Sequence, residues 1–269
     1  MNTTAGIIDY TSNAYGVAYV HEDETVRLGN SSGWYAGAVN NRFKFKDIGK
    51  SRENQTMIKA GVFKTMSPSF DHNGSLRWTI AGDVFAGRNE MKRRFLVVDD
   101  IFNAKADYTS YGAAFKTDLG YDVRLSERAH LRPYGALKME YGRFTDIKED
   151  SGEIRLEVDG NDYFSVKPEV GLEFKYVQPM ALKTNLSVGL AAAYENELGR
   201  VANGKNKARV RYTEADWFGV RGEKENRRGN GKFDLNVGID NTRFGVTVNA
   251  GYDTKGENVR GGLGFRLIY

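Results

Sequence analysis

The sequence contains no cysteine, only 4 prolines, and no long uninterrupted apolar stretch. A chain without cysteine forms no disulfide and has no zinc–thiolate site or cysteine nucleophile. No stretch approaches the roughly 20 consecutive apolar residues that a membrane-spanning helix needs. The mean hydropathy of −0.55 still permits a membrane protein built from strands, because alternating apolar and polar side chains average to a polar composition.

The chain also lacks a dominant charge of one sign. It has 39 Lys and Arg against 35 Asp and Glu, which gives a formal net charge of +4. The two signs are interspersed along the 269 residues, whereas a nucleic-acid-binding surface concentrates its positive charge. We therefore expect no nucleic-acid partner.

Sequence motifs for catalysis are absent as well. The three histidines, His21, His72 and His130, lie far apart and none has the spacing of metal ligands. There is no G-x-S-x-G nucleophile elbow and no G-x-G-x-x-G phosphate loop. We predict a protein that is not an enzyme and that has no metal site and no cofactor.

Alternation with a period of two residues is the dominant feature that is present. It is clearest over the last twelve residues, Asn258–Tyr269. A β-strand points successive side chains to opposite faces, so one face of this segment is apolar and the other carries Arg260 and Arg266. A strand with one apolar and one charged face is typical of a transmembrane β-barrel, which separates lipid from a hydrated interior.

Ten earlier runs show the same alternation and divide their residues into two sets. The apolar set, predicted to face lipid, contains Val259, Leu263, Phe244, Val246, Val248, Leu235, Val237, Leu186, Val188 and Leu190. The charged set, predicted to face the lumen, contains Lys116, Asp118, Asp122, Arg124, Lys138, Glu140, Lys167, Glu169, Glu173, Lys175, Glu195, Asp234, Arg260 and Arg266. Both signs occur on neighbouring runs, which predicts a salt-bridged and hydrated lumen.

Tyrosines recur near the ends of the apolar faces, namely Tyr121, Tyr141, Tyr176, Tyr194, Tyr252 and Tyr269. Such placement fits the aromatic girdles at the two membrane interfaces. The ordinary preference of tyrosine for strands explains it equally well, and the pattern alone does not separate the two interpretations.

Connection lengths favour a barrel and orient it. Segments Arg88–Asp107, Thr145–Asp162 and Gly199–Asn230 are long, whereas Ser126–His130 and Asn241–Thr242 are short. Outer-membrane barrels alternate short periplasmic turns with longer external loops. The C-terminus is therefore predicted on the periplasmic side.

These patterns predict an all-β fold, an antiparallel transmembrane β-barrel of about twelve strands. Only eleven runs are clear, and a closed barrel of this type needs an even number. A twelfth strand is expected within Thr3–Thr11 or upstream of Met1. We divide the chain into residues 1–12, a residual N-terminal segment or partial first strand, and residues 13–269, the barrel.

Several segments resemble the β-domain of type V secretion autotransporters over Leu131–Tyr269. They are LRPYGALKMEYGRF (131–144), VKPEVGLEFKY (166–176), LSVGLAAAYENELG (186–199) and GGLGFRLIY (261–269). Within the family, YENELGRVANGKNKAR and GYDTKGENVRGGLG are most similar to the barrels of large fusobacterial-type adhesin autotransporters.

The resemblance implies a bacterial outer-membrane barrel that exports and displays an N-terminal, adhesin-like passenger absent from this chain. It implies as partners the membrane lipid, the passenger, the outer-membrane assembly machinery and periplasmic chaperones. It further implies a monomeric barrel with external loops at the cell surface. By analogy, the C-terminal assembly signal consists of Gly264, Phe265, Leu267 and Tyr269.

Two alternatives remain open from the sequence. A small outer-membrane porin has the same strand pattern, and a soluble ligand-binding β-barrel belongs to a different class. A chain that is monomeric and folded without detergent is the soluble barrel. A porin is preceded by a signal peptide alone, whereas an autotransporter is preceded by a long passenger.

Overall fold

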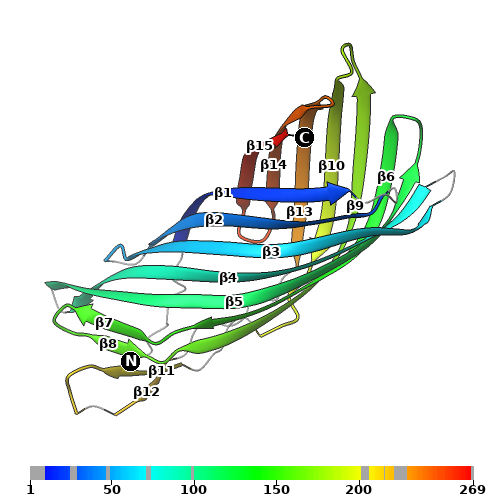
Figure 1. Ribbon diagram of the computed structural model, residues 1–269. Coiled ribbons are helices and arrows are strands. Elements are labelled where there is room, and N and C mark those ends of the chain that lie inside the picture. The colour runs from blue at the N-terminus through cyan, green and yellow to red at the C-terminus, as the bar shows by residue number, and fades with distance from the viewer. Residues whose placement is uncertain are drawn as a thin grey trace.

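The computed structural model describes residues 10–24, 29–46, 49–70, 74–97, 100–200, 206–214, 216–220 and 229–267 (Figure 1). Regular structure within these ranges is entirely β-strand and the strands pair antiparallel, which confirms the predicted all-β antiparallel fold. Among these residues, no helix has the length and apolar character needed to cross a membrane.

Eleven strands form the main path of one sheet, in the order in which they occur in the chain. They are β1 (Tyr10–Glu24), β2 (Ser31–Phe45), β3 (Arg52–Phe70), β4 (Gly74–Val97), β5 (Asp100–Arg124), β6 (Ala129–Phe144), β9 (Asn161–Pro179), β10 (Asn185–Glu195), β13 (Asn230–Asp240), β14 (Phe244–Asp253) and β15 (Asn258–Leu267).

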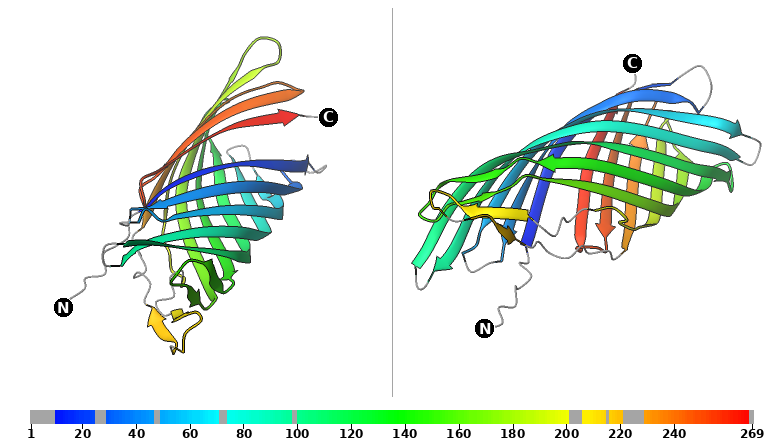
Figure 2. Two further views of the ribbon diagram at one scale, coloured as in Figure 1. Left: turned by 90° about the vertical axis from the view of Figure 1, so that its left-hand side faces the viewer. Right: turned by 90° about the horizontal axis from the view of Figure 1, so that it is seen from below.

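The sheet is strongly twisted and curls around a concave face (Figure 2). Strands β1 and β15 are the two edges of the described path. Because eleven strands alternate in direction, β1 and β15 run the same way. Residues 1–9 lie outside the described part of the chain, so the predicted twelfth strand and the boundary at residue 12 stay predictions.

Strand lengths differ greatly along the path. Strands β13, β14 and β15 have 11, 10 and 10 residues, which matches the 9–11 residues of a transmembrane strand. Strands β4 and β5 have 24 and 25 residues. The β4–β5 hairpin therefore extends far beyond the thickness of a membrane at one end of the sheet.

The expectation of a long loop over Arg88–Asp107 was wrong. Strands β4 and β5 stay paired from Arg88↔Thr109 to Val97↔Asp100. Beyond Ala86 the outward positions carry Arg88, Glu90 and charged residues after them, so the apolar alternation stops while the backbone ladder continues. Periodicity of hydrophobic residues could not detect that continuation.

Four short strands lie beside this extended hairpin (Figure 1). They are β7 (Ile147–Ser151), β8 (Leu156–Val158), β11 (Asn206–Val210) and β12 (Phe218–Val220). Strand β7 pairs with β5, β8 with β7, β11 with β8, and β12 with β11. The two remaining long connections thus build a small sheet, which we call the external sheet.

The connections at the opposite end are short. They span residues 125–128, 180–184 and 241–243 within the described ranges. Leu182 and Lys183 have positive φ angles of 58° and 55°, the backbone of a tight hairpin turn. Strand β10 begins at Asn185, directly after this turn.

Candidate functional site

Large apolar side chains cover the outward, convex face of the sheet. The register places every predicted lipid-facing residue there, from Leu186 on β10 to Val259 on β15. Val248 is 51% exposed and Leu263 is 70% exposed. Contiguous exposed apolar area of this kind marks a surface that contacts something other than water. We call these outward apolar residues the apolar belt.

The apolar belt ends at a sharp line on the long strands. On the outward face Ile58, Ala86 and Tyr111 lie side by side on β3, β4 and β5. Two residues further along the same strands the outward side chains are Thr56, Arg88 and Thr109. The belt therefore has a boundary on the side of the external sheet, and the next outward residues of β3, β4 and β5 beyond it are polar.

The tyrosines singled out from the sequence fall into two rows on the outward face. Tyr141, Tyr194 and Tyr252 lie at the end of the belt nearest the external sheet, whereas Tyr121 and Tyr176 lie at the other end. Tyr269 lies outside the described residues. Two rows at opposite ends of an apolar belt are the arrangement that girdles require.

The predicted charged residues share the concave face. Register pairs place Lys116, Lys138 and Lys167 opposite one another, and the remaining members have the same parity on their strands. His130 Nδ1 lies 3.2 Å from Asp122 Oδ1, and Arg266 lies 3.0 Å from Asp240. Within the described residues, no group of three or more His, Asp or Glu side chains is arranged to hold a metal ion.

One cluster of charges is centred on Arg132 of β6. Its guanidinium contacts Asp118 of β5 and lies 2.9 Å from Glu173 of β9. The Arg132 side chain is only 6% exposed, and it stacks over the Tyr134 ring at 5.1 Å. The cluster joins three consecutive strands through one buried cation.

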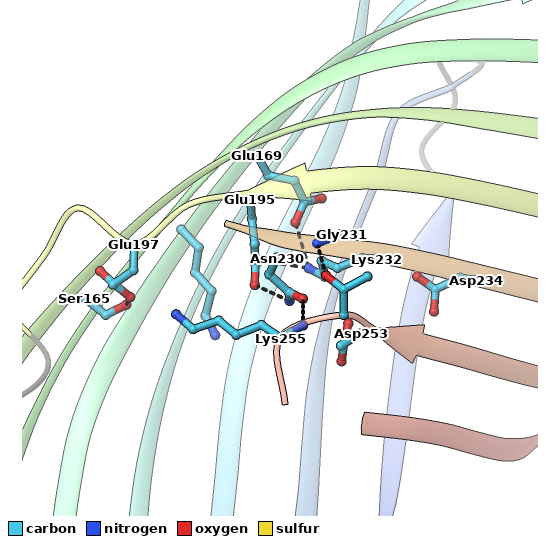
Figure 3. Close-up of polar contacts among 12 residues, drawn as sticks. Ser165, Glu169, Glu195, Glu197, Asn230, Gly231, Lys232, Asp234, Asp253 and Lys255 are labelled. Carbon is cyan, nitrogen blue, oxygen red and sulfur yellow. Dashed lines mark hydrogen bonds and ion pairs between the residues drawn. The ribbon is translucent and has the colours of Figure 1, made fainter. Parts of the chain in front are cut away.

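A second cluster is centred on Lys232 of β13 (Figure 3). Its ammonium lies 2.7 Å from Glu169 of β9 and 3.1 Å from Glu195 of β10. Asn230 donates to Glu195 at 3.1 Å, and Tyr134 donates to Glu169 at 2.7 Å. Tyr134 therefore connects this cluster with the Arg132 cluster, and the network runs continuously across the wall.

The three lysines at the same level, Lys116, Lys138 and Lys167, form a row across β5, β6 and β9. Like charges directly opposite one another are destabilising in a sheet. Lys138 lies 3.3 Å from Glu140, whereas Lys116 and Lys167 have no ion pair within 4 Å among the described residues. The row is thus a concentrated positive feature on the concave face.

The concave face encloses a cavity of about 470 Å³ lined by residues of ten strands. Tyr35 of β2 and Arg260 of β15 lie on its two sides although they are far apart in sequence. All three lysines of the row line it, together with carboxylates that include Asp83 and Glu169. The wall of this cavity therefore carries both positive and negative side chains.

Sequence reasoning missed several residues of this wall. Arg132 and Lys232 are the centres of both networks, and Lys59 lies 3.0 Å from Asp83. All three alternate with apolar neighbours, so extending the period-2 count by one or two residues would have found them. No pattern in the sequence indicates which charges lie within ion-pair distance, because that depends on the cross-strand register.

The predicted C-terminal signal lies on the free edge strand β15. Phe265 and Leu267 are outward and exposed, at 79% and 75%, and Gly264 lies on the concave face. Tyr269 is outside the described residues. Strand β15 is an edge of the described path, and its role as a signal stays a prediction.

An antiparallel curled sheet with an apolar exterior and a charged interior defines a β-barrel protein of the outer-membrane class. Consistent with this, the family profile of the autotransporter β-domain matches residues 1–265. The chain belongs to the autotransporter β-domain family. It is therefore an outer-membrane translocator for a passenger domain, as the resemblance had implied.

Solved structures of the same kind are similar to the chain in fold. The translocator domain of the autotransporter NalP from Neisseria meningitidis matches with a TM-score of 0.63 and 13% identity, over 97% of this chain and 80% of that one. The β-domain of the Bordetella autotransporter BrkA matches with a TM-score of 0.63 and 13% identity, over 97% of this chain and 89% of that one. Comparison with curated proteins gave no match.

Proposed function

We propose that this translocator exports and anchors an adhesin-like passenger, and that the passenger polypeptide moves along the concave face. The observation that supports this is the cavity of about 470 Å³ with charges of both signs from ten strands. A wall that offers charges of both signs can hold many different sequences by weak polar contacts. Such contacts suit a passage that must accept a long polypeptide without sequence preference.

The lysine row suits one part of that task. Lys116, Lys138 and Lys167 lie at a single level of the wall and include two ammonium groups without an ion pair among the described residues. Carboxylate side chains of a polypeptide in transit would form charge-assisted hydrogen bonds there. We expect the row to slow acidic segments relative to neutral ones.

Closure of the barrel belongs to the same proposal. Strands β1 and β15 run in the same direction. A single strand that runs antiparallel to both could therefore pair with the two edges and close the barrel. Residues that precede Tyr10 are the proposed source. Hydrogen exchange of the membrane-embedded protein tests this, because closure protects the outer amides of β1 and β15, whereas two open edges exchange quickly.

Further parts of the proposal concern the cellular setting. We infer a single barrel per passenger, with the external sheet at the cell surface and the short turns in the periplasm. The outer-membrane assembly machinery and periplasmic chaperones would recognise β15 through Gly264, Phe265 and Leu267, together with Tyr269. We assign the chain no catalytic role.

A display experiment tests the central part of the proposal. An epitope-tagged reporter, preceded by a signal peptide, is fused before Met1 and expressed in a Gram-negative host. We expect protease added to intact cells to remove the tag. A barrel that inserts while the tag stays protected would contradict the translocator role and would favour a porin.

A further inference from the structure

Four cations form a second row on the outward face, beyond the boundary of the apolar belt. Lys44 of β2 lies opposite Arg52 of β3, Arg52 opposite Lys92 of β4, and Lys92 opposite Lys105 of β5. All four side chains are exposed. We call them the basic row.

The basic row is not neutralised by the protein. None of its members has an ion pair within 4 Å among the described residues. The nearby outward carboxylates both form ion pairs with the guanidinium of Arg88, Glu90 at 3.7 Å and Asp107 at 2.8 Å. Two more arginines on this surface, Arg42 and Arg94, donate to the neutral side chains of Asn54 and Asn103.

Such a row is unfavourable unless an anion covers it. Like charges directly opposite one another destabilise a sheet, and here four follow one another on adjacent strands. The excess is large in context, because the whole chain has a formal net charge of only +4. The outward surface beyond the belt therefore carries four positive charges without an ion pair among the described residues.

The height of the basic row above the apolar belt limits which anion can reach it. Lys92 is six residues beyond Ala86, the residue of β4 at the boundary of the belt. At about 3.4 Å per residue and a strand tilt near 40°, that separation is roughly 15 Å. Lipid headgroups occupy roughly 5–8 Å beyond the hydrocarbon, so the backbone of the row lies outside that layer. Its cations meet headgroup phosphates by extending their stems back toward the interface. Arg88 lies closer still, two residues beyond Ala86.

We propose that the basic row, with Arg88 beside it, binds the phosphate groups of lipid headgroups in the outer leaflet around the barrel. Lysine and arginine are the side chains that bind phosphate most effectively. The patch is continuous with the apolar belt, so one phosphorylated lipid can place its acyl chains on the belt and its phosphates on the row. The proposal rests on the outer-membrane location and on the orientation proposed above, with the external sheet at the cell surface, but not on translocation.

Two charge-matched variants test it. The first, R52Q/K92Q/K105Q, removes three charges from the outward row. The second, K116Q/K138Q/K167Q, removes three charges from the concave face and is the control. Binding of diphosphoryl lipid A to each refolded protein is measured by native mass spectrometry from detergent, after heat-modifiable migration has verified folding.

We expect the outward variant to lose at least about tenfold in lipid affinity, since each cation near a membrane surface contributes appreciably, while the control binds as the unchanged chain does. Equal loss in both variants, or no loss in the first, would overturn the proposal. Competition by inorganic phosphate at equal concentration would also overturn it, because a free anion would then suffice. Surface display of the tagged reporter in the outward variant is scored separately, so a failure of lipid binding is distinguished from a failure of translocation.

Discussion

Arg132 holds two carboxylates on neighbouring strands and is almost fully buried. We predict that R132Q lowers the free energy of unfolding by about 3–5 kcal/mol, because it leaves the largely buried Asp118 without its cation and removes the nearer of two cations from Glu173. The control is R77Q, since Arg77 lies 3.6 Å from the same Glu173 but is 40% exposed, and it should cost under about 1 kcal/mol. Urea unfolding in lipid vesicles measures both. Equal effects would contradict the central place of Arg132.

Neighbouring residues on β14 test the assignment of the two faces. Val248 belongs to the apolar belt, whereas Asn249 lies on the concave face. We predict that V248R destabilises the membrane-inserted protein by about 2–4 kcal/mol, the cost of an arginine facing lipid near the midplane. N249R should change stability much less, because its charge meets water. Similar losses of unfolding free energy for both variants in lipid vesicles would contradict the assignment of the two faces.

At the scale of residues, alternation predicted the membership of the faces but not the contacts. Every charged residue chosen from the sequence shares the concave face in the register, from Lys116 on β5 to Arg266 on β15. The alternation shows which residues of a strand share a face, because every second residue points to the same side of the sheet. Ion pairs such as Lys232 with Glu169 depend on which residues lie opposite across strands that are distant in sequence, and no local pattern contains that information.

A buried carboxylate reinforces the backbone pairing that attaches the external sheet to the barrel. Glu149 of β7 is 1% exposed and receives two hydrogen bonds from Arg93 of β4, at 2.7 and 2.8 Å. It also accepts a hydrogen bond from the backbone amide of Leu156 at 2.6 Å. This side chain therefore fixes β7 and β8 against the β4–β5 hairpin.

We predict that E149A releases the external sheet while the barrel stays folded. The loss of the hydrogen bonds that Glu149 accepts from Arg93 and Leu156 should reduce local stability by about 3–5 kcal/mol. Limited proteolysis should then cleave within residues 145–160, with unchanged heat-modifiable migration of the barrel. The matched variant is E153A, whose side chain is exposed. Cleavage of E153A at the same rate as E149A would contradict this attachment.

A pH-dependent contact lies in the same external sheet. The hydrogen bond from Arg209 to Glu157 is 2.8 Å long and lowers the pKa of the Glu157 carboxyl below its ordinary value of 4.5. Folding thus favours the charged form, so its contribution to stability is present above pH 4.5 and is lost as the pH falls below it. Arg209 also lies over the Trp217 ring at 4.8 Å.

We therefore expect the emission of Trp217 to change on acidification below about pH 4.5. The measurement uses the W34F/W78F background, since the chain has 3 tryptophans. Adding E157Q should remove the transition, because the titrating carboxyl is gone. A transition that persists in E157Q would assign it to another group.

At the scale of elements, the sequence predicted the strands of the belt and missed the extension. Strands such as β13 and β14 alternate cleanly because one face meets lipid and the other meets charge. The outer parts of β4 and β5 carry many polar side chains on the outward face, so the hydrophobic pattern predicted a loop there. Their backbones nevertheless pair as far as Val97↔Asp100. The external sheet has short strands paired between distant segments, which no local periodicity predicts.

The whole molecule divides into three zones along the strands. The short turns come first, the apolar belt follows, and the extended hairpin with the external sheet lies beyond it. The concave face lies inside the belt and continues toward the external sheet. This order fits the proposed path, in which the polypeptide enters among the short turns and leaves on the side of the external sheet.

Site-specific photocrosslinking tests that path most directly. A photoreactive amino acid is placed at Ala136, which lines the cavity, or at Leu137, its outward neighbour on the same strand. A tagged reporter fused before Met1 is then stalled during export and the cells are irradiated. The account predicts adducts with the reporter from position 136 and none from position 137. Adducts from position 137, or equal adducts from both, would contradict passage along the concave face.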